Sequence, residues 1–153
     1  AEKRGIASAI ATNGTMLDLS GDAPRVVDQI ETGRTYLDGS VLIGAMDGVV
    51  RDRIRMALNG HAMVSVIIDE DDNPLPDAWV ELSGLPEKGR AGVPLASNLE
   101  SELAEFLERA DDKIVMDDDK LEDGIRKITR QVAMEEIGKK PEVTVIISRL
   151  AAE

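Results

Sequence analysis

The chain has 153 residues, which is enough for one domain with a sizeable core and no stabilising cross-link. Its 18 basic and 30 acidic residues give a net charge of −12, which repels polyanions and argues against capture of RNA or DNA by the chain as a whole. The absence of cysteine excludes disulfides and thiolate chemistry, and a single tryptophan, tyrosine and phenylalanine provide no aromatic platform for nucleic-acid bases.

The N-terminal residues 1–31 predict a small β-rich segment. The apolar run 6–10 is followed by Asn13-Gly14, a pair typical of hairpin turns, and further strands are expected over 15–19 and 25–30. The first five residues have the pattern of a helix C-terminus, which leads us to expect that the chain has been cut from a longer protein.

Residues 32–40 predict a linker, because two glycines and several small polar residues interrupt any periodicity. Glycines also interrupt the apolar stretch 41–50, which predicts irregular backbone there. A short helix is expected over 50–58, ended by Asn59-Gly60.

The continuous β-branched run 62–68 predicts a central strand that is buried on both faces. Its expected partner covers residues 78–82, and the two are joined by an acidic loop. The proline- and glycine-containing stretch 86–94 predicts an exposed loop.

Two amphipathic helices are expected next. Ser97 and Glu100 match a capping box at the start of the first helix, and Asp119 with Glu122 suggests a similar start for the second. Each helix carries one apolar stripe, and Gly138 is placed to end the second helix. The stripes consist of Leu99, Leu103, Phe106 and Ala110, and of Leu121, Ile125, Ile128 and Val132.

A final strand is expected over residues 142–147. The order of elements predicts an α/β fold of the α+β type: a small three-stranded, mainly β-branched sheet with two amphipathic helices packed on one face, preceded by a short β-rich segment.

The acidic loop 69–73 places carboxylates at the first positions of a calcium loop. Pro74 stands where that loop needs glycine, and Val80 stands where it needs glutamate, so a solvated hairpin loop is favoured. The cluster 117–119 is interpreted as a helix N-terminus. His61, the only histidine, is expected to be a hydrogen-bonded structural residue. We therefore assign no catalytic residue, no metal ligand and no cofactor to this chain.

A weaker hypothesis concerns the arginines. Arg34, Arg51, Arg53 and Arg55 could form a local basic patch that guides RNA, although the overall charge opposes it. No apolar run approaches the roughly 20 residues that cross a bilayer, so we expect no membrane contact. The cysteine-free composition is compatible with the cytoplasm.

The ordered set of segments resembles the C-terminal region of bacterial ribonuclease J. The segments that carry the resemblance are Gly33–Gly39, Val49–Arg53, the strand from Gly60 to Asp69, the turn Lys139-Lys140-Pro141 and the strand Val143–Ile147. By this resemblance, residues 1–31 are the tail of a metallo-β-lactamase domain, residues 32–40 are a linker, and residues 41–153 are the C-terminal accessory domain.

The resemblance implies a parent enzyme that degrades and processes RNA, as a 5′–3′ exoribonuclease and an endoribonuclease. The resemblance also implies zinc in the catalytic part of that parent, held by a His-x-His-x-Asp-His motif and further histidines. That motif is not present in this sequence, so it is expected upstream of this segment. The domain is expected to self-associate, to contact the parent's catalytic domains and to meet RNA only through the parent.

Overall fold

The computed structural model describes residues 2–151 and divides the chain into two compact units, one up to Arg51 and one from Asp52 onward. None of the helices in the described residues is both long and apolar enough to cross a membrane. The boundaries at residues 31 and 40 stay predictions.

The first unit consists of two β-hairpins after a short 3₁₀ turn. Its elements are η1 (Glu2–Arg4), β1 (Thr15–Asp18), β2 (Arg25–Gln29), β3 (Thr35–Asp38) and β4 (Val41–Gly44). The antiparallel pair β1–β2 confirms the second and third predicted strands, whereas residues 6–10 form no strand. Gly14 has φ +85°, and a Cβ atom there would lie 2.1 Å from the carbonyl oxygen of Ile30, so only glycine fits this turn.

The hairpin β3–β4 replaces the irregular backbone that was predicted for residues 41–50. Asp38 pairs with Val41, so a two-residue turn, Gly39-Ser40, joins the strands. Gly39 has φ +61°, the left-handed conformation that such turns need. Gly39, which was interpreted as an interruption, is therefore the turn residue that allows β3 and β4 to pair.

The second unit contains one mixed sheet and the helices that cover it. Its strands are β5 (His61–Ile68), β6 (Trp79–Ser83) and β7 (Glu142–Arg149); its helices are α2 (Leu95–Arg109), α3 (Asp112–Val115) and α4 (Asp118–Ile137). Strand β5 is central, antiparallel to β6 and parallel to β7. Helix α1 (Gly48–Asn59), predicted over 50–58, precedes β5.

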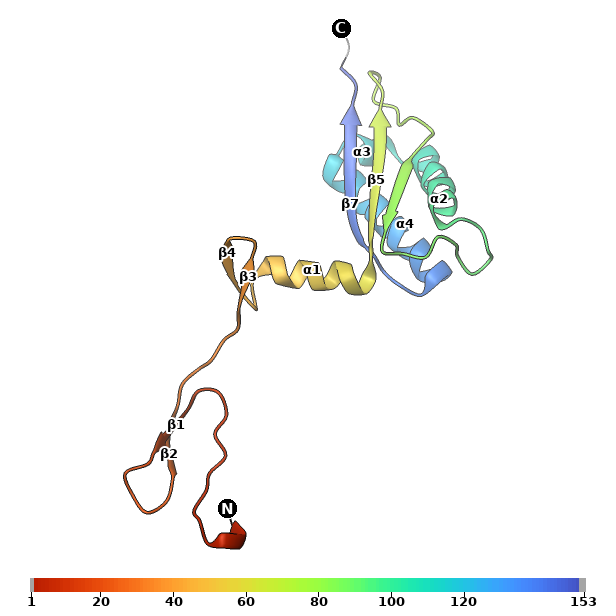
Figure 1. Ribbon diagram of the computed structural model, residues 1–153. Helices are drawn as coiled ribbons and strands as arrows, with labels where there is room; N and C mark the ends of the chain where they lie inside the picture. The colour runs from red at the N-terminus through yellow and green to blue at the C-terminus, as the bar shows by residue number, and fades with distance from the viewer. Residues whose placement is uncertain (1, 152–153) are drawn as a thin grey trace. The chain divides into compact units, whose positions relative to one another are not determined.

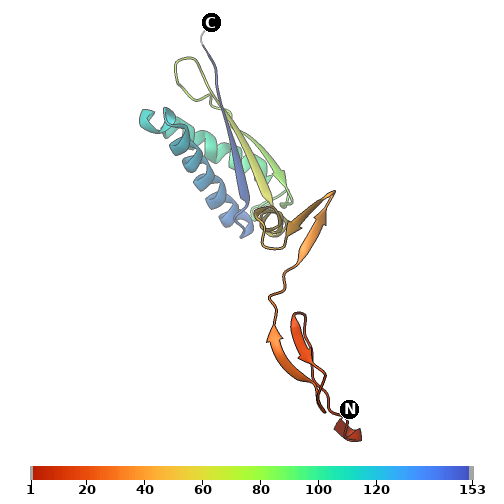
Figure 2. The ribbon, with the colours of Figure 1, turned by 90° about the vertical axis from the view of Figure 1, so that its left-hand side faces the viewer.

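Helices α2 and α4 cover one face of the sheet (Figures 1 and 2). Burial in β5 alternates strictly along the strand, so the prediction that this strand is buried on both faces was wrong. Both covering helices lie on the same side of the sheet, so only one face of β5 is buried. A run of β-branched residues does not by itself show whether one face or both faces of a strand are covered. The predicted α+β fold is confirmed. The buried residues of β5 are Ala62, Val64, Val66 and Ile68.

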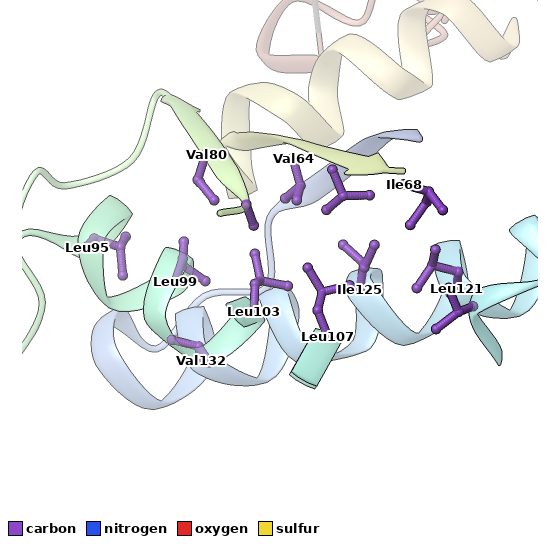
Figure 3. Packing of buried hydrophobic residues seen from close by; sticks show 13 residues of the cluster. Val64, Ile68, Val80, Leu95, Leu99, Leu103, Leu107, Leu121, Ile125 and Val132 are labelled. Atoms are coloured by element: carbon purple, nitrogen blue, oxygen red, sulfur yellow. The ribbon is translucent and has the colours of Figure 1, made fainter. Parts of the chain in front are cut away.

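The core lies between that face and two leucine- and isoleucine-rich helix stripes (Figure 3). In α2 the buried stripe is shifted by one turn towards the N-terminus, because the helix begins at Leu95 and not after Ser97. The predicted Phe106, Ala110 and Ile128 are only partly buried. The buried helix residues are Leu95, Leu99, Leu103 and Leu107 in α2, and Leu121, Ile125, Thr129, Val132 and Ala133 in α4.

The helix ends differ from the two capping boxes that were predicted. Pro94 stands at the N-cap of α2, and no side chain caps that end. Helix α4 is capped by Asp117 and not by Asp119, because the Asp117 carboxylate accepts a hydrogen bond from the Lys120 backbone N–H at 3.2 Å. Gly138 ends α4 with φ +69°, as predicted.

Candidate interaction surface

One face of the three-stranded sheet is left uncovered by α2 and α4 (Figure 2). We call it the open face. Along each strand its residues alternate with the buried ones, and the strand register places them in rows across the sheet. The open face consists of His61, Met63, Ser65, Ile67, Trp79, Glu81, Ser83, Glu142, Thr144, Ile146 and Ser148.

The middle row of the open face is apolar at both ends. Ser65 of β5 is aligned with Trp79 on one side and with Ile146 on the other. Trp79 is 54% exposed and Ile146 is 43% exposed. Glu81 and Glu142, the first residue of β7, are the acidic residues of the open face, and Glu142 is 3.6 Å from the Arg130 guanidinium. The middle of this surface therefore carries little charge for a chain of net charge −12.

His61 lies at the start of the open face. Its Nε2 atom is 2.9 Å from the Thr144 hydroxyl, which links β5 to β7 and confirms the predicted hydrogen-bonded histidine. Asp52 and Met56 of α1 line a pocket of about 190 Å³ beside it. The pairing with Thr144 gives this histidine a structural role in the sheet.

The outer edge of β6 is protected by a side chain. The Glu100 carboxylate of α2 accepts a hydrogen bond from the Val80 backbone N–H at 3.2 Å. A polar side chain over an edge N–H is one way in which proteins prevent further strand pairing. Glu100 was predicted to take part in a capping box, but in the structure it is the hydrogen-bond partner of a backbone N–H at the sheet edge.

The outer edge of β7 has no such protection from the described residues of the second unit, 52–151. The backbone N–H groups of Glu142 and Leu150 bond to Gly60 and Ile68, on the β5 side. Backbone groups alternate in direction along a strand, so the N–H and C=O groups of Val143, Val145 and Ile147 point away from β5. This eight-residue edge contains no proline or lysine.

The structure does not gather the predicted arginines on one helix face. Arg51, Arg53 and Arg55 all lie on α1, but Arg53 is rotated by about 200° from Arg51 around the helix axis. Arg55 is 3.8 Å from the Asp52 carboxylate. Arg34 directly precedes β3, where its carbonyl accepts a hydrogen bond from Ala45 at 2.7 Å. A role for these residues in RNA contact stays a prediction.

The two acidic clusters have structural partners. The Asp69 carboxylate accepts hydrogen bonds from the backbone N–H groups of Asp71 and Asn73, at 2.9 and 2.7 Å, so it organises the hairpin loop. Asp117 caps α4, and the hydrogen bond from the Lys120 side chain lowers the pKa of this carboxyl below its ordinary value. In the described part of the chain, no group of three or more potential ligands is placed to hold a metal ion.

Sequence reasoning missed three features of this surface: the open face, the exposed Trp79 and the unprotected edge of β7. A signal for the first was present. Thr144 and Ser148 are polar residues four apart in the apolar run of the last strand, and Ser65 is a polar residue in the apolar run of the central strand. Residues an even number apart along a strand lie on one face. The state of the two edges depends on Glu100, whose position relative to β6 only the tertiary structure provides.

Comparison with known proteins identifies the family of this chain. Residues 48–150 match the family model described as the ribonuclease J C-terminal domain. A curated relative, ribonuclease J of Sinorhizobium meliloti, is 30% identical over 138 residues. That alignment covers 90% of this chain but 24% of the relative, so the chain spans about a quarter of the relative's length.

Proposed function

Because the chain belongs to the ribonuclease J C-terminal domain family, we propose that it is the non-catalytic accessory end of an RNA-degrading and RNA-processing enzyme. In this proposal the domain supports oligomerisation and thereby the full activity of the parent, which acts as a 5′–3′ exoribonuclease and an endoribonuclease. The observation that carries it is the match over residues 48–150.

The surface of the second unit supports a role in self-association. An acidic chain of net charge −12 repels a second copy over most of its surface. The open face and the adjoining β7 edge offer an approach with little charge, and exposed apolar residues in a protein surface commonly mark interaction sites. The second copy and the parent's own catalytic domains are the partners that we propose.

The chemistry of RNA cleavage belongs, in this proposal, to the catalytic part of the parent. Zinc is proposed there, where a bound metal ion activates water for attack on phosphate. RNA is then met through the parent, and the working compartment is the cytoplasm. The contribution of this domain is the placement of the catalytic parts relative to one another.

The proposal is tested on the parent enzyme, prepared with and without residues 48–150. We expect removal of the domain to lower the assembly mass in sedimentation experiments and to reduce turnover of a 5′-monophosphorylated RNA. A parent that keeps both its mass and its RNA turnover without these residues would contradict the proposal. A parent that loses turnover at unchanged mass would restrict the domain to support of the catalytic part.

A further inference from the structure

We propose that β7 of one copy pairs antiparallel with β7 of a second copy across a two-fold axis. The two three-stranded sheets then form one six-stranded sheet, with β7 and its symmetry mate at the centre. This inference rests on the self-association proposed above and assigns the strand that mediates it.

The two edges of the sheet differ in a way that favours β7. At β6 the Glu100 carboxylate occupies the Val80 N–H. At β7 the outward N–H and C=O groups of Val143, Val145 and Ile147 have no backbone partner among the described residues of the second unit, 52–151. A long unprotected edge of β-branched residues is a template for strand addition. Because Glu100 occupies an outward N–H group of the five-residue β6, the longer, eight-residue edge of β7 is the better template for an added strand.

Charge favours a second copy as the occupant. The open-face residues of β7 beyond its first position are Thr144, Ile146 and Ser148, none of which carries a charge. An isologous contact brings the same surface patch of both partners together, so a charge on the two-fold axis would face its own copy and charges near the axis would lie close to one another. A nearly uncharged strand in a chain of net charge −12 is therefore the surface on which two copies meet with least repulsion.

The sequence of β7 fits a two-fold register centred on Ile146. In this register Val145 is opposite Ile147 of the second copy, and their outward backbone groups form the hydrogen-bonded pairs. Thr144 is opposite Ser148, which matches two hydroxyls across the strands. Ile146 meets its own symmetry mate on the open face in a non-hydrogen-bonded pair, where Cα atoms approach to about 4.5 Å.

Charge exchange at Ile146 tests this symmetric contact. Ile146 is 43% exposed, so Ile146→Lys and Ile146→Glu are compatible with folding of the monomer. Each variant alone places like charges opposite each other, and we expect its dimer dissociation constant to rise by about tenfold or more. An equimolar mixture of the two variants should regain the dimer, since lysine then faces glutamate.

The matched control is Ile67→Lys, which changes the open face of β5 and leaves the β7 edge intact. We expect its dimerisation to equal that of the original chain. Circular dichroism melting of all three variants establishes that each folds. If the chain dimerises and the Ile146 variants dimerise equally well, the β7 contact is wrong while self-association stands. If the original chain is monomeric at all concentrations, both proposals fail for this chain.

Hydrogen exchange gives a second, independent readout. The amides of Thr144, Ile146 and Ser148 bond to β5 in the monomer and should be protected at every concentration. The amides of Val145 and Ile147 should become protected only as the concentration rises. If the mass of the chain in solution rises with concentration but the protection of these two amides does not change, the pairing is contradicted.

Discussion

The Arg149 guanidinium at the end of β7 lies 2.8 Å from the Asp118 carboxylate at the start of α4, and 2.9 Å from the carboxylate of Asp72. One side chain therefore joins the last strand, the first turn of α4 and the acidic hairpin loop. Asp72 has φ +62°, an uncommon conformation for a residue with a side chain, and its ion pair with Arg149 helps to hold the loop.

Replacement of Arg149 tests this connection. Arg149→Ala should reduce the free energy of unfolding by about 1–2 kcal/mol, a modest amount because the pairs are partly exposed to solvent. Arg149→Lys should recover part of this loss, since lysine keeps the charge but not the several directed hydrogen bonds. Urea unfolding of both variants measures the difference. Equal stability of the alanine variant and the original chain would show that the ion pairs contribute nothing.

Gly124 of α4 faces the ring of Phe106 in α2. A Cβ atom on Gly124 would lie 2.5 Å from the Phe106 Cζ atom. In an open helix, glycine to alanine stabilises by about 1 kcal/mol. We expect Gly124→Ala to destabilise instead, because the ring must move. In the Phe106→Ala background the same substitution should stabilise, and thermal unfolding of the four proteins provides the cycle.

Leu103 lies at the centre of the core and is fully buried between α2 and the sheet. Leu103→Ala should reduce the free energy of unfolding by about 2–5 kcal/mol, through lost burial and the remaining cavity. The exposed Met116, changed to alanine, is the matched control and should have little effect. Denaturant titration distinguishes the two, and a small effect at Leu103 would contradict the placement of the core.

The Asp117 cap predicts a pH dependence. Its pKa is lowered in the folded chain, first by the hydrogen bond from the Lys120 side chain and then by that from the Lys120 backbone N–H. The unfolded chain therefore binds the proton more readily, so this stabilisation is present above the unfolded pKa of 3.8 and is lost as pH falls through the lower folded pKa.

Asp117→Asn retains a good N-cap residue without the titrating group. We expect the stability difference between the original chain and this variant to be constant near pH 7 and to shrink towards zero in acid, below about pH 4. Chemical unfolding at a series of pH values measures it. A difference that persists unchanged into strong acid would exclude the charge of Asp117 as its cause.

The alternative role in RNA guidance is tested at the arginines. If Arg34, Arg51, Arg53 and Arg55 contact RNA, their replacement by alanine should weaken binding and make its salt dependence shallower, by about 0.7 in logarithmic slope per lost phosphate contact on single strands. If the domain serves self-association and does not contact RNA itself, fluorescence anisotropy titrations of the 153-residue chain should show no such change.

Much of the second unit could be predicted from the sequence, because its strongest signals are local. The apolar spacing from Leu121 onward predicts α4, and Gly138 predicts its end. The predicted start of α2 was wrong because Ser97 and Glu100 match the pattern of a capping box. In the structure the Glu100 carboxylate accepts a hydrogen bond from the Val80 backbone N–H, 20 residues earlier in the chain. Which face of β5 is buried also depends on packing against α2 and α4, which are distant in the sequence. The position of the open face could therefore not be predicted from the strand alone.

Light scattering over a dilution series measures the mass of the chain in solution and so tests self-association of the domain. We expect a concentration-dependent equilibrium between a monomer of 16.5 kDa and a species of twice that mass. A mass that stays at 16.5 kDa up to high protein concentration would contradict autonomous self-association of this domain.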